Sequence, residues 1–223
     1  TIDVSANAID MKAGADTIGA ANIRYASATT LTVGTITTSA DVSLVAGGNI
    51  TDNETGTDID LTARKLRIEA MGGVGAGANH LETSVDSLSA TVGTGGLFIT
   101  EANAIDVNTV GPVVVNRVKT GGDVTGSTQT DLVQSDLVSA GAIVLQAAGA
   151  ITTIATSGDI SAAGNILIKA QGATNDITLG GTVISTGGSV SLNSADAINQ
   201  NANITASGTG KTIDLLAGGN IVM

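Results

Sequence analysis

The sequence predicts an all-β protein whose short strands wind into a parallel β-solenoid of about 23 residues per coil. Three observations predict this fold: an apolar pattern that recurs at a fixed period, glycines that precede it, and a composition poor in helix formers. The chain has 223 residues, of which 30 are Gly and only two are aromatic, Tyr25 and Phe98. Among its 20 acidic residues 16 are Asp, which suits turns, whereas Glu, which suits helices, occurs four times.

The recurring pattern is a ladder of alternating apolar residues that leads into a corner. Four ladders occupy the second half of the chain: Ile143–Ala147, Ile166–Ala170, Val190–Ser194 and Ile213–Ala217. Their first residues are 23, 24 and 23 positions apart, a spacing typical of solenoids. Alternation at every second residue is the period of a β-strand. We therefore expect Ile143, Ile166, Val190 and Ile213 to lie on top of one another in successive coils.

Each coil is predicted to contain three short strands. Gly141, Gly164 and Gly188 stand two residues before a ladder, where a residue without Cβ turns most easily. A further apolar segment lies between ladders, as at Val183. A triangular coil cannot bury its own apolar side, but coils stacked about 4.8 Å apart pair every backbone group with the coils above and below.

The first half of the chain repeats the same pattern. Ladders stand at Val42–Ala46 and Ile2–Ala6, and the string Ala-Asn-Ala-Ile-Asp occurs at 6–10 and again at 102–106. Residues 1–223 are therefore expected to form a single solenoid segment of a longer repetitive protein.

Two stretches, 71–95 and 107–140, break the rhythm. They contain the only His and the only Pro of the chain. Insertions in solenoids project from corners, so we expect irregular structure or loops that leave the rod in both stretches.

Charge and hydropathy exclude several classes of partner. The formal net charge is −11 and the pI is near 4.1, so the surface repels phosphate backbones and no nucleic-acid partner is expected. No apolar run approaches the roughly 18 residues that span a bilayer, so no membrane insertion is expected. The chain starts at Thr1 without a leader pattern, and we expect any export signal to lie outside these residues.

Several corner strings resemble those of a known family. They are Gly-Gly-Asn-Ile at 47–50 and 218–221, Gly-Asp-Ile-Ser-Ala-Ala-Gly-Asn-Ile at 158–166, and Gly-Gly-Ser-Val-Ser-Leu at 187–192. Together they resemble the coils of filamentous-haemagglutinin-like adhesins, which are large exported bacterial surface proteins. The resemblance implies a right-handed parallel β-helix.

The same resemblance implies a structural shaft or adhesin segment, extracellular or at the bacterial cell surface. Such a segment spaces or displays binding regions and can self-associate end to end. Its partners would be neighbouring solenoid segments of the same protein, like chains, or a ligand on a host cell or biofilm surface. The Asn-Pro-Asn-Gly-type motif of the family's secretion domain is missing, which favours the repetitive shaft, and no functional residue carries over.

The candidate metal ligands are Asp52, Glu54, Asp58 and Asp60, the densest acidic run in the chain. Oxygen ligands this close could hold calcium, and an exported protein meets millimolar calcium, which suits weak extracellular sites. A solvated acidic corner is the alternative. No other cofactor is expected.

Catalytic chemistry finds little support, so no enzyme activity and no catalytic residue are expected. A nucleophilic triad needs a general base beside Ser or Cys, and the only imidazole is that of His80. Because His80 stands in Gly-rich surroundings, we interpret it as a solvent-exposed loop histidine. Arg64, Lys65 and Arg67 are interpreted as a solvated strand face, with an anionic-glycan site as the alternative. A carbohydrate-active β-helix enzyme remains a second hypothesis, which rests on the acidic run and on fold analogy.

Two further patterns have structural or functional interpretations. Asn49, Asn165 and Asn220 occupy similar corners, and we expect their stacked amides to bond one another from coil to coil. Threonines in 29–32 and 35–38 suggest an ice-binding solenoid as a third hypothesis. That function needs a flat Thr-x-Thr array on every coil, and the coils from 141 onward lack one.

Overall fold

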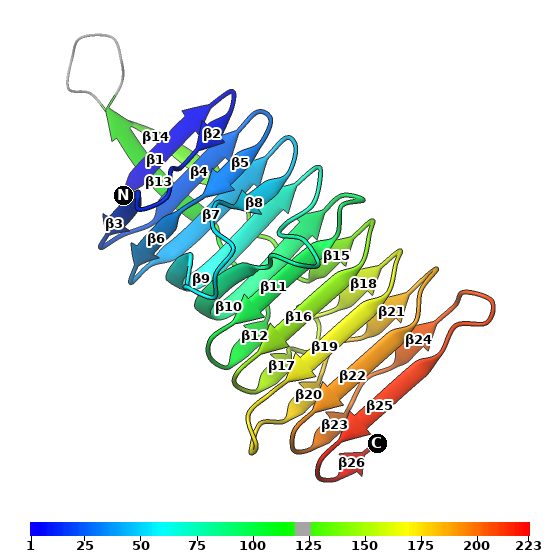
Figure 1. The fold of residues 1–223 in the computed structure, drawn as a ribbon. Helices are drawn as coiled ribbons and strands as arrows, with labels where there is room; N and C mark the ends of the chain where they lie inside the picture. Colours follow the sequence, from blue (N-terminus) through cyan, green and yellow to red (C-terminus); the bar gives the residue numbers. More distant parts are fainter. Residues whose placement is uncertain (119–125) are drawn as a thin grey trace.

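In the computed structural model, which describes residues 1–118 and 126–223, the chain forms a rod of stacked coils (Figure 1). Consecutive coils pair through parallel strands at about 23 residues per coil, which confirms the predicted all-β solenoid. The described residues contain no helix, and hence none that is long and apolar enough to cross a membrane.

Each coil contributes strands to three faces, which we name A, B and C. Face A stacks β1 (Ile2–Ala6), β4 (Ile23–Ser27), β7 (Asp41–Ala46), β15 (Leu137–Ser139), β18 (Ile160–Ala162), β21 (Val183–Ser185) and β24 (Ile204–Ala206). Face B stacks β2 (Ile9–Asp10), β5 (Leu31–Val33), β8 (Ile50–Asp52), β11 (Leu97–Glu101), β16 (Ile143–Ala147), β19 (Ile166–Ala170), β22 (Val190–Ser194) and β25 (Ile213–Ala217). Face C stacks β3 (Asp16–Gly19), β6 (Thr35–Thr38), β12 (Ile105–Val107), β17 (Ile151–Thr153), β20 (Ile177–Leu179), β23 (Ile198–Gln200) and β26 (Ile221–Val222).

Two long strands join faces C and A without a break. β9 (Leu61–Ala70) pairs with β6 near its start and with β7 towards its end. β10 (Leu81–Val92) pairs with β9, and the next coil covers it with three separate strands. These are β11 over residues 81–83, β12 over 87–88 and β15 over 90–92. The shape of the coil therefore changes at β10.

The core is a continuous stack of aliphatic side chains inside the rod. Ile143 faces Ile166, Ile166 faces Val190, and Val190 faces Ile213, which confirms the predicted column. Inward residues of β16, β19 and β22 are buried and the residues between them are partly exposed, as the alternating pattern predicted. Tyr25 is the one aromatic residue in the core of the described part, so branched aliphatic residues do nearly all of the packing.

The ladder pattern does not keep to one face. The ladders Ile2–Ala6 and Val42–Ala46 form β1 and β7 on face A, whereas the four ladders of the second half lie on face B. The change takes place across β10, because β11, in the next coil, already pairs with β16. Two ladders of similar sequence are therefore not necessarily stacked on each other.

The two stretches that break the rhythm have different structures. Residues 71–95 include the long strand β10 and an isolated bridge at Val74. Residues 107–140 include an antiparallel hairpin of β13 (Val113–Val118) and β14 (Gly126–Asp131), and the intervening 119–125 lie outside the described residues. The hairpin lies against β1, β4 and β7 on the outside of face A, behind β1 in Figure 1.

Candidate functional site

Three carboxylates from different turns of the chain meet in one cluster. Asp52 ends β8, Asp60 directly precedes β9, and Glu82 is the second residue of β10. Carboxylate oxygens of the three residues lie within 4.8 Å of one another. Because β9 and β10 pair with Leu61 opposite Thr83, Asp60 stands beside Glu82 of the next coil. Asp60 is buried, whereas Asp52 is partly exposed.

Backbone and amide groups hold two of these carboxylates in place. Asp60 Oδ2 accepts the backbone N–H of Glu82 at 2.9 Å. Asp52 Oδ1 accepts the N–H of Glu54 at 2.9 Å, and its Oδ2 accepts Nδ2 of Asn79 at 3.0 Å. Asn79 Nδ2 also donates to the carbonyl of Glu54 at 2.7 Å, so the loop after β8 is tied to the next coil.

Burial and like charge keep the cluster from ionising fully at neutral pH. Desolvation by burial raises the pKa of Asp60 to about 8, and the charge of Asp52 adds to the effect against the N–H of Glu82. Desolvation also raises the pKa of Glu82, with the charge of Asp52 acting in the same direction. The cluster therefore holds a proton near pH 7 and shares less than three negative charges.

The structure brings together two of the four predicted metal ligands and adds one that the sequence reasoning missed. Asp52 and Asp60 belong to the cluster, whereas Glu54 and Asp58 are exposed and lie outside it. Glu82 follows Asp60 by one coil, so adding the period of the ladder to the acidic run points to it. In a solenoid, a ligand of such a site comes from the neighbouring coil as well as from residues nearby in sequence.

The spacing of the cluster suits a cation better than hydrolysis. Calcium binds oxygen at about 2.3–2.6 Å, so two of its ligands lie up to about 5 Å apart, which includes the separation found here. Glycosidase carboxyl pairs are more widely separated, by about 5–5.5 Å in retaining and about 6.5–9.5 Å in inverting enzymes. Asp52, Asp60 and Glu82 are accordingly the residues that could hold calcium.

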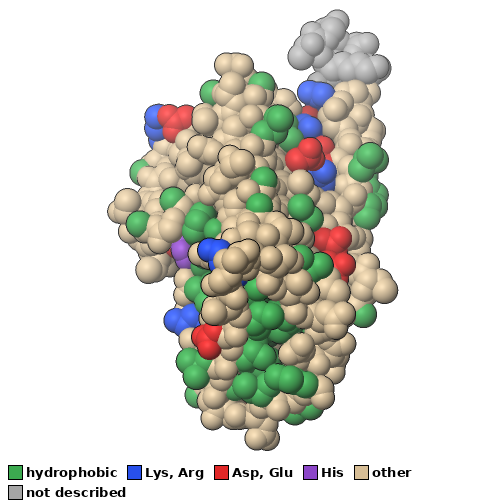
Figure 2. Space-filling model, turned by 90° about the vertical axis from the view of Figure 1, so that its right-hand side faces the viewer, with side chains coloured by type: hydrophobic (Ala, Val, Ile, Leu, Met, Phe, Trp, Pro, Cys, Tyr) green, Lys and Arg blue, Asp and Glu red, His purple; other side chains and the backbone are tan. Residues whose placement is uncertain are grey.

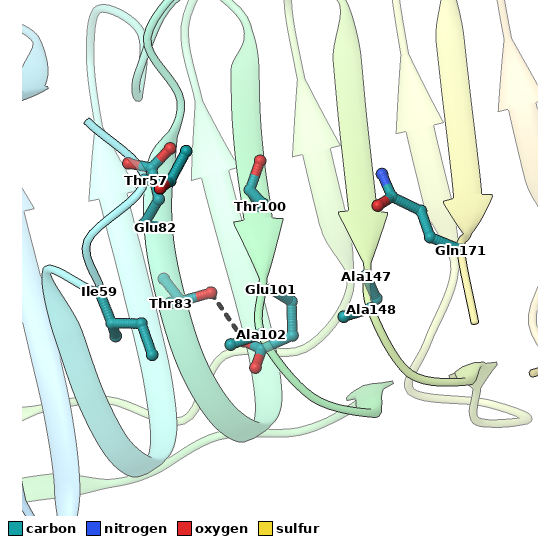
Figure 3. Close-up of a pocket in the computed structure, with 10 residues that line it drawn as sticks. All are labelled: Thr57, Ile59, Glu82, Thr83, Thr100, Glu101, Ala102, Ala147, Ala148 and Gln171. Carbon is teal, nitrogen blue, oxygen red and sulfur yellow. Dashed lines mark hydrogen bonds between the residues drawn. The ribbon is translucent and has the colours of Figure 1, made fainter. Parts of the chain in front are cut away.

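A cavity of about 140 Å³ lies next to the cluster, and Glu82, Thr100, Glu101 and Gln171 are among its lining residues (Figure 3). The carboxylate of Glu101 is buried and accepts the Thr83 hydroxyl at 2.7 Å. Burial raises the pKa of Glu101 to about 7, against these and other hydrogen bonds. Figure 3 shows Glu101 turned toward Thr83 and away from Glu82, so the two acids do not face a common point.

His80 lies beside this cavity and is bonded to one of its walls. Its Nδ1 is 2.8 Å from the Thr100 hydroxyl, and its ring lies 5.9 Å from that of Phe98 between centroids. Desolvation by burial lowers the pKa of His80, which disfavours the charged imidazolium. In the part of the chain that the structure describes, no side chain bonds Nε2 to orient the ring as a third catalytic group would.

The basic residues of β9 do not form one exposed patch. Arg64 pairs with Asp41 at 2.9 Å, whereas Arg67 is buried and pairs with Glu69 at 2.7 Å. The alternative of an anionic-glycan site on this strand thus loses the side chain of Arg67.

The threonines of β6 do not extend into a flat array. Thr35 and Thr37 stand opposite Asp16 and Ile18 of the preceding coil. The lattice of threonines that ice binding needs is therefore interrupted between the first two coils.

The corner asparagines bond to backbone groups of the next coil. Asn49 accepts the N–H of Gly73 at 2.8 Å and Asn165 that of Ser189 at 2.9 Å, in place of the expected amide-to-amide contact. Asn220 lies at a different corner, between β25 and β26. We call each such bond a corner clamp. Seven corner clamps occur in the described residues, always from an Asp or Asn directly before a strand: Asn22 to Asp41, Asn49 to Gly73, Asp60 to Glu82, Asp136 to Asp159, Asp159 to Thr182, Asn165 to Ser189 and Asp176 to Ala197.

The polar side chains at these corners thus join one coil to the next. The acidic cluster differs from them, because it gathers three carboxylates next to a cavity. Comparisons of the chain with protein-family models, with curated proteins and with solved structures found no match.

Proposed function

We propose that this chain is a structural shaft segment of a large exported bacterial surface protein of the filamentous-haemagglutinin-like kind, which spaces or displays binding regions. The observation that carries the proposal is the corner clamp, repeated at seven corners over an aliphatic core. The Asp and Asn side chains at these corners form hydrogen bonds between coils, where an enzyme could use such side chains for catalysis or ligand binding. A solenoid of this construction gains length by adding coils without changing its cross-section.

Exposed apolar residues of the last coil support neighbouring segments or like chains as partners. Ile213, Ile221 and Met223 are 46%, 41% and 82% exposed. Figure 2 shows hydrophobic side chains gathered at the lower end of the molecule, the end at which this coil lies in Figure 1. Another coil stacked there would bury these side chains and pair the open edge of β25.

Electron microscopy and sedimentation of the purified chain test the proposal. We expect rods that join end to end as the concentration rises, and single rods for Ile221→Lys, which places a charge on the exposed end. Val138→Lys is the matched control, because Val138 is 41% exposed on the outside of β15, between β10 and β18 in the middle of the rod, and should leave the association unchanged. Particles that stay single at every concentration would contradict end-to-end association, and antibody labelling of bacterial cells only after lysis would contradict a surface location.

A carbohydrate-active enzyme is the second candidate, and the cavity beside Asp60 and Glu82 is the observation in its favour. Incubation with acidic polysaccharides tests it. Turnover by the parent that is lost in Asp60→Asn and Glu82→Gln would establish the enzyme. A parent without activity on any of these substrates removes it.

A further inference from the structure

The hairpin β13–β14 and the residues 132–134 that follow it form a strap along the outside of face A. The strap leaves the rod after β12 and returns at β15, yet it reaches back to the first coil. Thr1 Oγ1 accepts the N–H of Asn116 at 2.9 Å, and in the second coil Asn22 Nδ2 donates to the carbonyl of Val114 at 3.1 Å. A segment 92 to 115 residues away in sequence is thereby bonded to the first two coils.

The other end of the strap is bonded to the coils of β9 and β10. Arg67 Nε donates to the carbonyl of Leu132 at 2.9 Å. Gln134 Nε2 donates to the carbonyl of Ile68 at 3.0 Å and to the Thr91 hydroxyl at 2.8 Å. The strap therefore contacts strands from β1 to β10, whereas a coil of a solenoid otherwise contacts only its neighbours.

A little-exposed ion network fixes the middle of the strap. Arg24 Nε lies 2.9 and 3.0 Å from the two carboxylate oxygens of Asp131, and Nη1 lies 3.1 Å from Asp3. The side chains of Arg24, Asp131 and Asp3 are 14%, 11% and 1% exposed. Arg117 of the strap adds a contact with Asp3 at 3.5 Å. Charges this little exposed are weakly screened, so removal of one partner leaves a charge uncompensated.

The buried apolar side chains of the strap are separate from the core of the rod. Val113 and Val115 are fully buried but do not belong to the cluster of side chains inside the coils. The row beneath the strap is largely polar, since Arg24, Ser43 and Arg67 are register neighbours on successive strands. Loss of the strap would leave the interior of the rod packed, while it would expose the outside of face A.

We propose that the strap is a clasp that joins the coils from β1 to β10 into one cooperative unit. Within the described residues the strap contacts β1, β4 and β7 directly, and it bonds to residues of β9 and β10 through Leu132 and Gln134. Opening of the first coil then requires that the strap contacts break too. The strap makes no contact with the described coils from β16 to β26, so their opening does not require that the strap contacts break.

Hydrogen exchange of backbone amides tests the clasp in Asp131→Asn, which keeps the shape of the side chain and removes its charge. We expect exchange in β1, β4 and β7 to accelerate on the order of tenfold, with exchange in β19 and β22 unchanged. Asp214→Asn is the matched control, because it removes a charge from exposed β25, away from the strap. Unchanged exchange in β1 and β4 overturns the proposal, whether or not the strap itself opens.

A second variant makes the test independent of how well Asp131→Asn folds. Thr1→Cys with Asn116→Cys places a disulfide across the contact between strap and first coil, in a chain that has no other Cys. In the Asp131→Asn background, the oxidised form should return exchange in β1 and β4 to the rate of the parent, and reduction should reverse the effect. Equal rates in the oxidised and reduced forms would overturn the clasp.

Discussion

Asp159 accepts the backbone N–H of Thr182 in the next coil, with 2.7 Å between Oδ1 and the nitrogen. Its own N–H donates to Oδ1 of Asp136 in the coil before, at 2.9 Å. One side chain type thus links three coils at the same corner. A corner clamp uses a backbone donor that the turn would otherwise leave without a partner.

Removal of this clamp should cost measurable stability. Asp159→Ala leaves the N–H of Thr182 without an acceptor, and we expect the free energy of unfolding to fall by about 1–3 kcal/mol. Asp159→Asn keeps the accepting oxygen and should stay within about 0.5 kcal/mol of the parent. Denaturant unfolding followed by circular dichroism measures both variants. Equal stability of the two variants would show that the clamp contributes nothing.

Close stacking at the corners predicts an intolerance to added side chains. Gly93 donates its N–H to the carbonyl of Ala70, and a methyl group on it would overlap the carbonyl oxygen of Met71. We expect Gly93→Ala to lower the free energy of unfolding by about 1–3 kcal/mol. Gly56→Ala is the control, since a Cβ there meets only the nitrogen of Asp58 at 3.7 Å. A Gly93→Ala protein as stable as the control would show that the corner has room to adjust.

Stability should decrease with rising pH through the titration of Glu101. Its pKa is about 7 in the folded chain against an ordinary value of 4.5, so between these values the folded state binds more protons than the unfolded state. The contribution of neutral Glu101 is complete below pH 4.5 and is lost as the pH rises through 7, with about 3 kcal/mol as its upper bound.

Glu101→Gln is the variant that isolates this contribution. Its amide can donate to the Thr83 hydroxyl while its oxygen still accepts the N–H of Asn103. We expect the difference in unfolding free energy between the variant and the parent to grow in favour of the variant from pH 4.5 to pH 8. A difference that is constant over this range would place the pKa of Glu101 near its ordinary value.

The acidic cluster responds to pH in the same direction as Glu101, because burial also raises the pKa of Asp60. Asp60→Asn keeps an oxygen for the N–H of Glu82 and removes the like-charge repulsion, so it should raise the melting temperature above pH 8, where the parent carboxylate is ionised. Below pH 4 the two proteins should melt together. A lower melting temperature for the variant at pH 9 would contradict a raised pKa at this position.

The same proteins test calcium as the ligand of the cluster. A calcium-dependent rise in the melting temperature of the parent, absent from Asp60→Asn, is the result that supports a bound ion. Asp58→Asn is the matched control, because Asp58 is exposed outside the cluster and should respond to calcium as the parent does. A parent that does not respond removes calcium from consideration.

The sequence was sufficient to predict the fold class, the coil period and the column of Ile143, Ile166, Val190 and Ile213. These features depend on a local pattern that repeats, and a repeated pattern can be read without knowing the coordinates. The face on which a ladder lies is different information. Nothing in Val42–Ala46 distinguishes face A from face B, because the choice depends on how many residues each intervening corner consumes.

Two of the three residues of the acidic cluster could be predicted from the sequence, and the third depends on how the coils stack. Asp52 and Asp60 are close in sequence, but Glu82 joins them only through the pairing of β9 with β10. The path of the strap could not be predicted either, since the ion pair of Arg24 with Asp131 joins residues 107 positions apart that share no period.

Because β10 pairs with three separate strands of the next coil, the ladders change face there. A long, straight molecule bound along the rod would therefore contact different side chains on the two sides of β10. Outward side chains of a ladder, such as Val45 in β7, point from one side of the triangular prism, whereas those of the later ladders, such as Leu167 in β19, point from another. A filament or receptor that grips the ladder side chains on one half would find unrelated residues as soon as it passed the middle. A partner that binds the ladder side chains along the whole rod would have to follow them from face A to face B. A straight partner would contact the ladders of one half only.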